Sequence, residues 1–288
     1  MKRAFEFSDE KSHKFWWIES LEEKFVVNYG KIDSIGKYEI KEWDSIEECE
    51  KQAEKLIKSK IKKGYKEINN FDFENRYYFD DMEYDIDFLT SHPNFRKHFT
   101  DEQLYCNCGD EETPFGSDTG NDVLHIIEEK IRKNKNFSFS DFPKYLIEKE
   151  WGIEYFEPVP IIDEKTFAED LKIKDKGLSR EAIINESDEV VIATAFAQIK
   201  ITGKINENLK ERALLSLKRM ELIAKICGYG ESEINKQLYN DLESFENKKT
   251  LKIPTYLKNN IKDYVEKDFS TMTIVSSSGN DLLEVWYC

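Results

Sequence analysis

The chain has 288 residues, of which 39% are apolar and 13% aromatic, so a globular protein of one or two domains with a sizeable core is expected. No apolar run reaches the roughly 20 residues of a membrane helix, and the N-terminus lacks the apolar stretch of a secretory signal, so we expect a cytoplasmic protein. Five cysteines without framework spacing favour reduced thiols, and a net charge of −15 argues against nucleic-acid binding by the chain as a whole.

The charge is unevenly placed along the sequence. Residues 1–68 contain 15 basic and 15 acidic residues, whereas residues 69–125 contain 3 basic and 14 acidic ones. Because screening limits exposed charges to about 8 Å at physiological salt, acid on a separate segment does not cancel a local basic face. We predict a first domain over 1–70, an acidic linker over 71–90 and a second domain over 91–288.

The first domain is predicted to be a small antiparallel sheet covered by one helix. Aromatic and β-branched runs separated by turn residues predict its strands. The predicted strands are 14–21, 24–32 and 37–43. Ser45 and Glu48 form a capping-box pair at the start of a helix over 45–63, and Gly64 ends it. Such a unit belongs to the α+β class.

The second domain is predicted to be mostly α-helical with a C-terminal β-hairpin. Apolar residues at helical spacing predict its helices. These cover 121–133, 140–150, 163–172 and 189–202, and further apolar stripes run from Leu209 to Cys227 and from Ile234 to Phe245. Short glycine-bearing connections between the last three helices predict an antiparallel bundle. The hairpin is expected from strands at 271–275 and 282–287 around a serine-rich turn.

The helix over 45–63 carries a second stripe, which is made of lysines. Four of them recur at intervals of four, three and four residues, and a fifth lies near the helix end. They are Lys51, Lys55, Lys58 and Lys62, with Lys60 as the fifth. A row of mobile cations suits phosphate binding, because each neutralised phosphate releases counterions. The alternative is a solvated face, in which Glu47 pairs with Lys51 and Glu54 with Lys58.

The order of these elements resembles the WGR domain, a nucleic-acid-associated module of ADP-ribosyltransferases and many bacterial proteins. Tyr29-Gly30-Lys31 ends the second strand where that family has its name-giving tripeptide, and Tyr65 follows the basic helix end. The resemblance implies that Tyr29 stacks on a sugar at DNA ends or nicks, while Lys31, Lys37 and Lys60 contact phosphates. Lysine lacks the planar fork with which arginine grips phosphate, so weak, sequence-independent binding is expected.

The predicted nucleic-acid-binding residues combine this resemblance with the lysine stripe. They are Tyr29, Lys31, Lys37, Lys51, Lys55, Lys58, Lys60 and Lys62. The second domain resembles the one that follows WGR in YfeS-type bacterial proteins. The segments that carry this resemblance are 91–95, 113–122 and 188–198. It implies no established activity, and we interpret the second domain as a partner-binding unit.

Metal and catalytic sites are not expected. The loop from Phe115 to Asp122 could begin a calcium site, but Val123 stands where a calcium loop requires glycine, and helix capping by Asp118, Asn121 or Asp122 is the simpler interpretation. Four possible zinc ligands match no standard spacing. They are His92, His98, Cys106 and Cys108. No catalytic motif is recognisable, so we expect a non-enzymatic protein without a cofactor.

Two other functions stay open. In one, the acidic segment 80–122 binds a basic protein partner and the WGR-like part is only a scaffold. In the other, some of its carboxylates serve a metal-dependent hydrolase. Clusters of this composition are more often solvated surface, and we interpret the carboxylates between Asp80 and Glu112 in that way.

Overall fold

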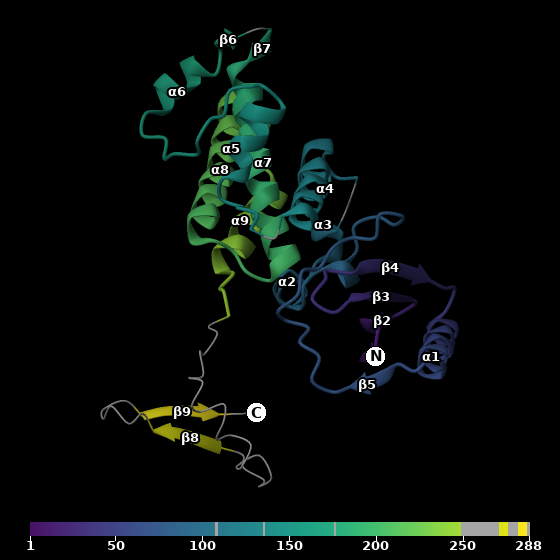
Figure 1. Cartoon of the computed structure of the whole chain (residues 1–288). Helices are drawn as coiled ribbons and strands as arrows, with labels where there is room; N and C mark the ends of the chain where they lie inside the picture. The colour runs from purple at the N-terminus through teal and green to yellow at the C-terminus, as the bar shows by residue number, and fades with distance from the viewer. Residues whose placement is uncertain (107–108, 135, 176, 249–270, 276–281, 287–288) are drawn as a thin grey trace. The chain divides into compact units, whose positions relative to one another are not determined.

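Five N-terminal strands form one antiparallel sheet in the order β4-β3-β2-β1-β5 (Figure 1). Their bounds are β1 Lys2–Ser8, β2 His13–Leu21, β3 Lys24–Lys31, β4 Lys37–Glu42 and β5 Lys66–Ile68. The computed structural model describes residues 1–106, 109–134, 136–175, 177–248, 271–275 and 282–286. The three predicted strands are confirmed, and β1 and β5 widen the sheet beyond the prediction.

Helix α1 (Ile46–Lys62) packs on one face of the sheet. The side chain of Ser45 accepts a hydrogen bond from the backbone N–H of Glu48 at 3.2 Å, as the capping box predicts. Alternation along the strands divides their apolar residues between the two faces. Trp16 and Ile18 join the core beneath α1, whereas Trp17 joins the larger core on the other face.

The remainder of the first 247 residues is mostly helical, as predicted. The helices are α2 Pro93–His98, α3 Glu102–Tyr105, α4 Asp118–Lys133, α5 Phe142–Tyr145, a π-helical turn at Leu146–Glu150, α6 Glu164–Asp170, α7 Arg180–Thr202, α8 Glu207–Cys227 and α9 Glu233–Ser244. A single 3₁₀ turn covers Phe88–Thr90, and a two-stranded ribbon pairs β6 (Lys174–Asp175) with β7 (Leu178–Ser179). Helix α7 is buried nearly all round and runs beside α8 (Figure 1). Ser117, not one of the predicted residues, caps α4.

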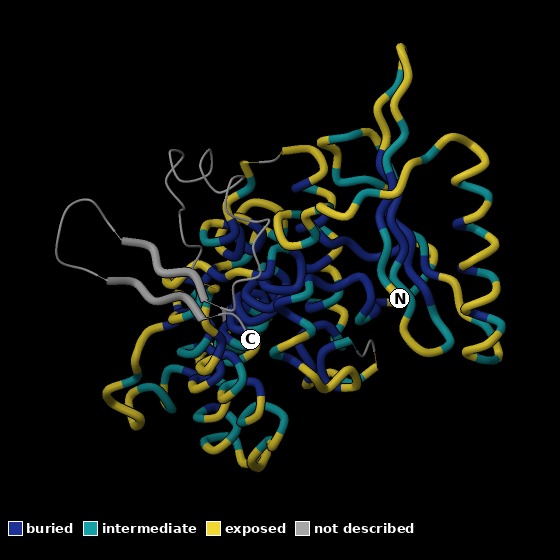
Figure 2. The backbone as a smooth tube through the Cα atoms, turned by 90° about the horizontal axis from the view of Figure 1, so that it is seen from below, coloured by how far each residue is buried: buried dark blue, intermediate teal, exposed yellow. Residues whose placement is uncertain are grey.

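The sheet and the helices share one hydrophobic core, and residues 1–247 form one compact unit (Figure 2). Residues from 71 onward lie against the sheet face that α1 leaves open. The Trp17 ring lies 5.7 Å from the Phe73 ring and 6.0 Å from the Tyr78 ring, between centroids. The backbone N–H of Tyr78 donates to the carbonyl of Ile201 in α7 at 2.9 Å. The predicted domain boundaries at 70 and 90 stay a prediction. In the structure, the sheet packs directly on residues that follow position 70.

A buried charge cluster joins that segment to α7 and α4. The Lys200 ammonium is 0% exposed and donates to both carboxylate oxygens of Asp80, at 2.7 and 2.8 Å. Glu128 accepts the backbone N–H of Asp80 at 2.9 Å. Asp81 and Asp87 are also buried, and Asp81 accepts the backbone N–H of Ile40 at 2.9 Å. The interpretation of these three aspartates as solvated surface is therefore wrong, because each satisfies a buried polar group.

Stability should depend on pH through Glu128. Burial, and then the neighbouring charge of Asp80, raise the pKa of Glu128 to about 8. The folded chain therefore keeps a proton that the unfolded chain releases above about pH 4.3, so this group costs stability as pH rises from there to about 8. Glu128→Gln keeps the hydrogen-bond acceptor but cannot ionise. The free energy of unfolding of this variant, relative to that of the wild type, should therefore rise by about 2 kcal/mol or more between pH 5 and pH 8.

Urea unfolding at several pH values measures this difference. The exposed neighbour Glu129, which pairs with Lys133, provides the matched control as Glu129→Gln. If the free energies of unfolding of wild type and Glu128→Gln change in parallel with pH, the folded chain does not hold the extra proton on Glu128.

Residues 248–288 form a second unit, in which β8 (Thr271–Val275) pairs antiparallel with β9 (Leu282–Trp286). The turn of the predicted hairpin, at 276–281, lies outside the described residues, as does Cys108. Among the described residues, no helix is long and apolar enough to span a membrane.

Candidate nucleic-acid interface

The end of the sheet gathers cations on the face that carries α1. The register of β2 and β3 places Lys14 opposite Lys31, and Trp16 opposite Tyr29. The register of β3 and β4 places Lys37 opposite Tyr29. Because residues opposite one another in an antiparallel pair point to the same face, these side chains lie together. Like charges directly opposite are unfavourable, so the Lys14–Lys31 pair costs stability in the free protein.

Lys60 enters this group from the end of α1. Its ammonium lies 5.2 Å from the centroid of the Trp16 ring, 5.5 Å from that of Tyr29 and 5.3 Å from that of Tyr65. Burial lowers the pKa of Lys60, the nearby charges of Lys63 and Lys14 lower it further, and the charge of Glu39 acts in the opposite direction. We call Lys14, Lys31, Lys60 and Lys63 the basic cluster. Three aromatic rings thus hold the Lys60 ammonium in place, and Lys63 and Lys14 lie near enough to act on its charge.

Tyr29 is half-buried and engaged on two sides. The Lys60 ammonium lies over its ring, and its hydroxyl donates to Glu39 at 2.5 Å, which raises the pKa of Tyr29. Glu39 also pairs with Lys37 at 2.9 Å. The Tyr29 side chain therefore contacts both Lys60 and Glu39, and the sugar-stacking role that the resemblance implies stays a prediction.

The glycine of the Tyr29-Gly30-Lys31 signature is required by close packing. A Cβ at Gly30 would lie 2.6 Å from the Ser34 hydroxyl and 2.9 Å from the Gly36 Cα. Gly36 itself has φ +81°, and Asn28 donates to the backbone carbonyls on both sides of it at 3.2 Å. The turn that follows β3 is thereby fixed, and with it the direction of the strand end that carries Lys31.

The lysine stripe of α1 divides into paired and unpaired members. Lys51 pairs with Glu48 at 3.0 Å, and Lys58 with Glu54 at 3.1 Å. The first pairing differs from the predicted Glu47 partner, because three-residue spacing also brings helical side chains together. Among the described residues, Lys55 and Lys62 are exposed and form no ion pair, nor do Lys14, Lys31 and Lys63. In the described part of the chain, none of the four lysines of the basic cluster forms an ion pair, whereas two of the four in the stripe do.

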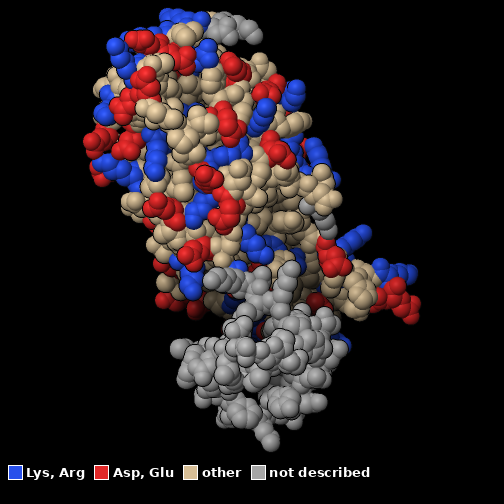
Figure 3. Space-filling view, turned by 90° about the vertical axis from the view of Figure 1, so that its left-hand side faces the viewer, with Lys and Arg blue, Asp and Glu red and all other residues tan. Residues whose placement is uncertain are grey.

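The other candidate ligands have structural roles. His92 caps α2 through Nδ1, and its Nε2 lies 2.9 Å from the carbonyl of Glu74. His98 Nε2 lies 2.8 Å from the carbonyl of Asp241, and burial raises the pKa of the Cys106 thiol. In the part of the chain that the structure describes, no three His, Cys, Asp or Glu side chains are grouped as a metal site requires. On the helical face of Figure 3, acidic and basic side chains are interspersed.

Lys14 and Lys63 were absent from the predicted interface. A two-residue turn at Glu22-Glu23 fixes the register of its hairpin, so the sequence carries the signal that places Lys14 opposite Lys31. No comparable signal exists for Lys60 over its three rings, because α1, β2, β3 and Tyr65, three residues beyond the end of α1, contribute together.

Comparisons with known proteins agree with both resemblances. The WGR domain family matches residues 1–72. "Uncharacterized protein YfeS" of Escherichia coli K12 is 45% identical over 248 residues, which cover 85% of this chain and 98% of that protein. "Protein YehF" of the same organism is 38% identical over 65 residues, which are 23% of this chain and 24% of YehF. A solved structure from Bacteroides fragilis is 29% identical over 44% of this chain and 39% of its own, and its TM-score of 0.24 is too low to support a structural inference.

Proposed function

Since the chain belongs to the YfeS family and carries a WGR domain over residues 1–72, we propose that this domain binds nucleic-acid backbone without reading its sequence. WGR domains generally bind nucleic acid. The observation that carries the proposal is the basic cluster, in which Lys14 lies opposite Lys31 and the charges of Lys14 and Lys63 act on Lys60. A phosphate placed among these ammonium groups would relieve their repulsion and release counterions.

The chemistry of the cluster favours backbone contacts over base contacts. Lysine is a point charge that suits phosphate oxygens, and such contacts carry no sequence information. Base edges are commonly read by arginine, asparagine or glutamine, and the basic cluster contains none of these. The proposed role is binding and not catalysis, with the helical part holding the WGR domain or engaging a partner.

The alternative role, an acidic surface for a basic protein partner, draws less support from the structure. Asp80, Asp81 and Asp87 contribute to the acidic segment 80–122 but are buried and hydrogen-bonded within the molecule. Their charge is therefore not presented to a partner. Glu111 and Glu112 in the same segment are exposed, and they form part of a pocket described below.

A salt titration of the full chain tests the proposed function. Fluorescent duplexes of one sequence, intact or nicked, and a second intact sequence are titrated between 50 and 200 mM salt. Four phosphate contacts predict that log affinity plotted against log salt concentration has a slope of about −3 to −4. Affinity should therefore fall about a hundredfold between 50 and 200 mM salt. The two sequences should bind equally, and tighter binding to the nicked duplex would identify a preference for DNA breaks.

The full chain is required for this experiment. Removing residues beyond 70 would expose Phe15, Trp17 and Tyr38, which the shared core buries. Absent binding at 50 mM salt, or an affinity that does not change with salt, would overturn the proposal.

A further inference from the structure

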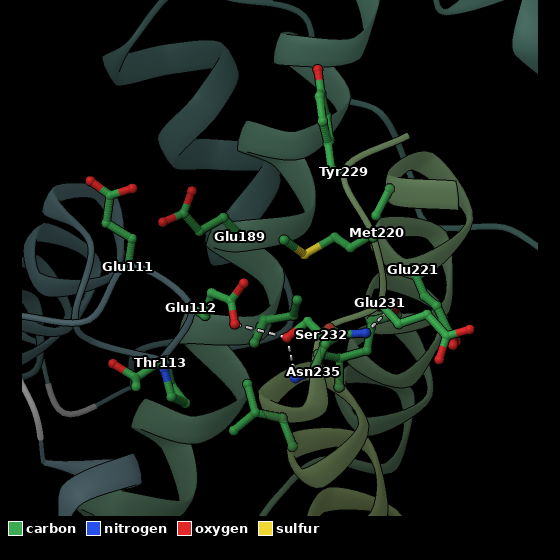
Figure 4. Close-up of a pocket in the computed structure, with 16 residues that line it drawn as sticks. Glu111, Glu112, Thr113, Glu189, Met220, Glu221, Tyr229, Glu231, Ser232 and Asn235 are labelled. Carbon is green, nitrogen blue, oxygen red and sulfur yellow. Dashed lines mark hydrogen bonds between the residues drawn. The ribbon is translucent and has the colours of Figure 1, made fainter. Parts of the chain in front are cut away.

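A pocket of about 330 Å³ lies among α7, α8 and α9 and the loop before α4 (Figure 4). Its volume is within the range of small-molecule sites. Apolar side chains line its interior, and Met220 reaches into it from α8. These side chains are Pro114, Ile192, Leu217, Met220, Ala224 and Leu238.

Carboxylates supply the charge around this apolar interior. Five glutamates line the pocket, and its lining includes no lysine, arginine or histidine. They are Glu111, Glu112, Glu189, Glu221 and Glu231. Figure 4 shows Glu111, Glu112 and Glu189 on one side of Met220, and Glu221 and Glu231 on the other. The pocket thus combines an apolar interior with carboxylates at its edge, and within the described ranges Glu231 is the one of the five that pairs with a lysine.

Most of these carboxylates have no cationic partner among the described residues. Glu231 pairs with Lys236 at 2.6 Å, whereas Glu112 accepts only a hydroxyl hydrogen bond, from Ser232 at 2.9 Å. Glu189 is half-buried and accepts a hydrogen bond from the Ser117 hydroxyl. Burial raises the pKa of Glu189, the hydrogen bond from Ser117 opposes this shift, and the charges of Glu186 and Glu111 add to it. A half-buried carboxylate held among other carboxylates is stabilised when a cation enters beside it.

We propose that this pocket binds an aliphatic amine, with its ammonium group beside Glu189 and Glu111 and its alkyl stem along Met220 and Leu217. The stem would replace water on apolar walls, and the ammonium would offset the clustered negative charge. An anion would meet only repulsion there, and a neutral alkyl chain would leave the carboxylates uncompensated. The site is separate from the basic cluster, so its test does not depend on nucleic-acid binding.

Calorimetric titration of the full chain with hexylamine at low salt tests this site. Hexylamine should bind, and each methylene removed from the stem should weaken binding about fourfold. Hexanol, which has the same stem without the charge, should bind at least tenfold more weakly, and hexanoate should not bind. These comparisons use the unaltered protein, so they do not depend on the folding of a variant.

Variants then locate the binding. Glu189→Gln should weaken hexylamine binding at least tenfold, while Glu211→Gln, an exposed change on α8 outside the pocket, should leave it within twofold. Equal binding of hexanol and hexylamine, an equal loss in both variants, or no binding at millimolar amine would overturn the proposal.

The amine could be a free molecule or the side chain of a lysine in another protein. A blocked lysine, Nα-acetyl-lysine methylamide, distinguishes these two sources. If it binds as tightly as butylamine, the pocket admits a protein side chain. If it is excluded while butylamine binds, the ligand is a free amine.

Discussion

Replacing all four lysines of the basic cluster by glutamine should reduce the affinity for duplex DNA at least a hundredfold at 50 mM salt. The changes are Lys14→Gln, Lys31→Gln, Lys60→Gln and Lys63→Gln. The slope of log affinity against log salt concentration, expected at between about −3 and −4 for the wild type, should approach zero in this variant. Each lost phosphate contact removes about 0.9 from the magnitude of the slope. Fluorescence anisotropy across a salt series measures both quantities.

A second fourfold variant provides the matched control. It changes the same number of lysines on the exposed stripe of α1, namely Lys51, Lys55, Lys58 and Lys62. Two of these already pair with glutamates of their own helix, so the slope should change by less than about 2. A larger loss in the stripe variant than in the cluster variant would move the interface to the outer face of α1. Melting curves of both variants confirm that the sheet is intact, since Lys60 contacts three rings.

Lys200→Met should destabilise the folded chain by about 3–5 kcal/mol, because it leaves the Asp80 carboxylate buried without its partner. Methionine fills a similar volume, so the loss reports charge and not packing. Adding Asp80→Asn removes the uncompensated charge, and the double variant should recover more than half of the loss. Urea unfolding followed by circular dichroism gives the free energies.

Lys225→Met serves as the comparison on the neighbouring helix. Lys225 is exposed, and its ammonium lies 3.6 Å from Glu164 at the surface, so its loss should cost less than about 1 kcal/mol. A loss of stability for Lys200→Met as small as this would contradict a stabilising role for the buried Lys200–Asp80 pair. A double variant that is no more stable than Lys200→Met alone would contradict it too.

The sequence predicts the parts of this fold that follow a regular period. The strands at β2, β3 and β4 and the capped helix α1 are found within two residues of their expected bounds. Helix α7 starts nine residues earlier than predicted, because its first turns carry polar side chains such as Asn185 and Glu186 that hide the apolar pattern.

The segment over 71–90 was the least predictable. Tyr78 and Phe79 are buried although they belong to no helix or strand, because this irregular segment lies between the sheet and the helices, so no apolar period marks them in the sequence. The candidate site likewise contains residues that could be predicted from the sequence and contacts that could not. The resemblance supplies Lys31, Lys37 and Lys60 alike by position, whereas the ring contacts of Lys60 arise only when distant elements meet.

The shared core couples the two parts of the molecule thermodynamically. If the sheet and the helical bundle unfold together, a ligand that binds only the folded sheet must stabilise the bundle by the same free energy. DNA bound at Lys31 should then slow hydrogen exchange in α7, whose Ile201 carbonyl accepts the Tyr78 amide beneath the sheet. An amine bound beside Glu189 should in turn raise the midpoint at which Trp17 becomes exposed to solvent, with neither ligand touching the site of the other.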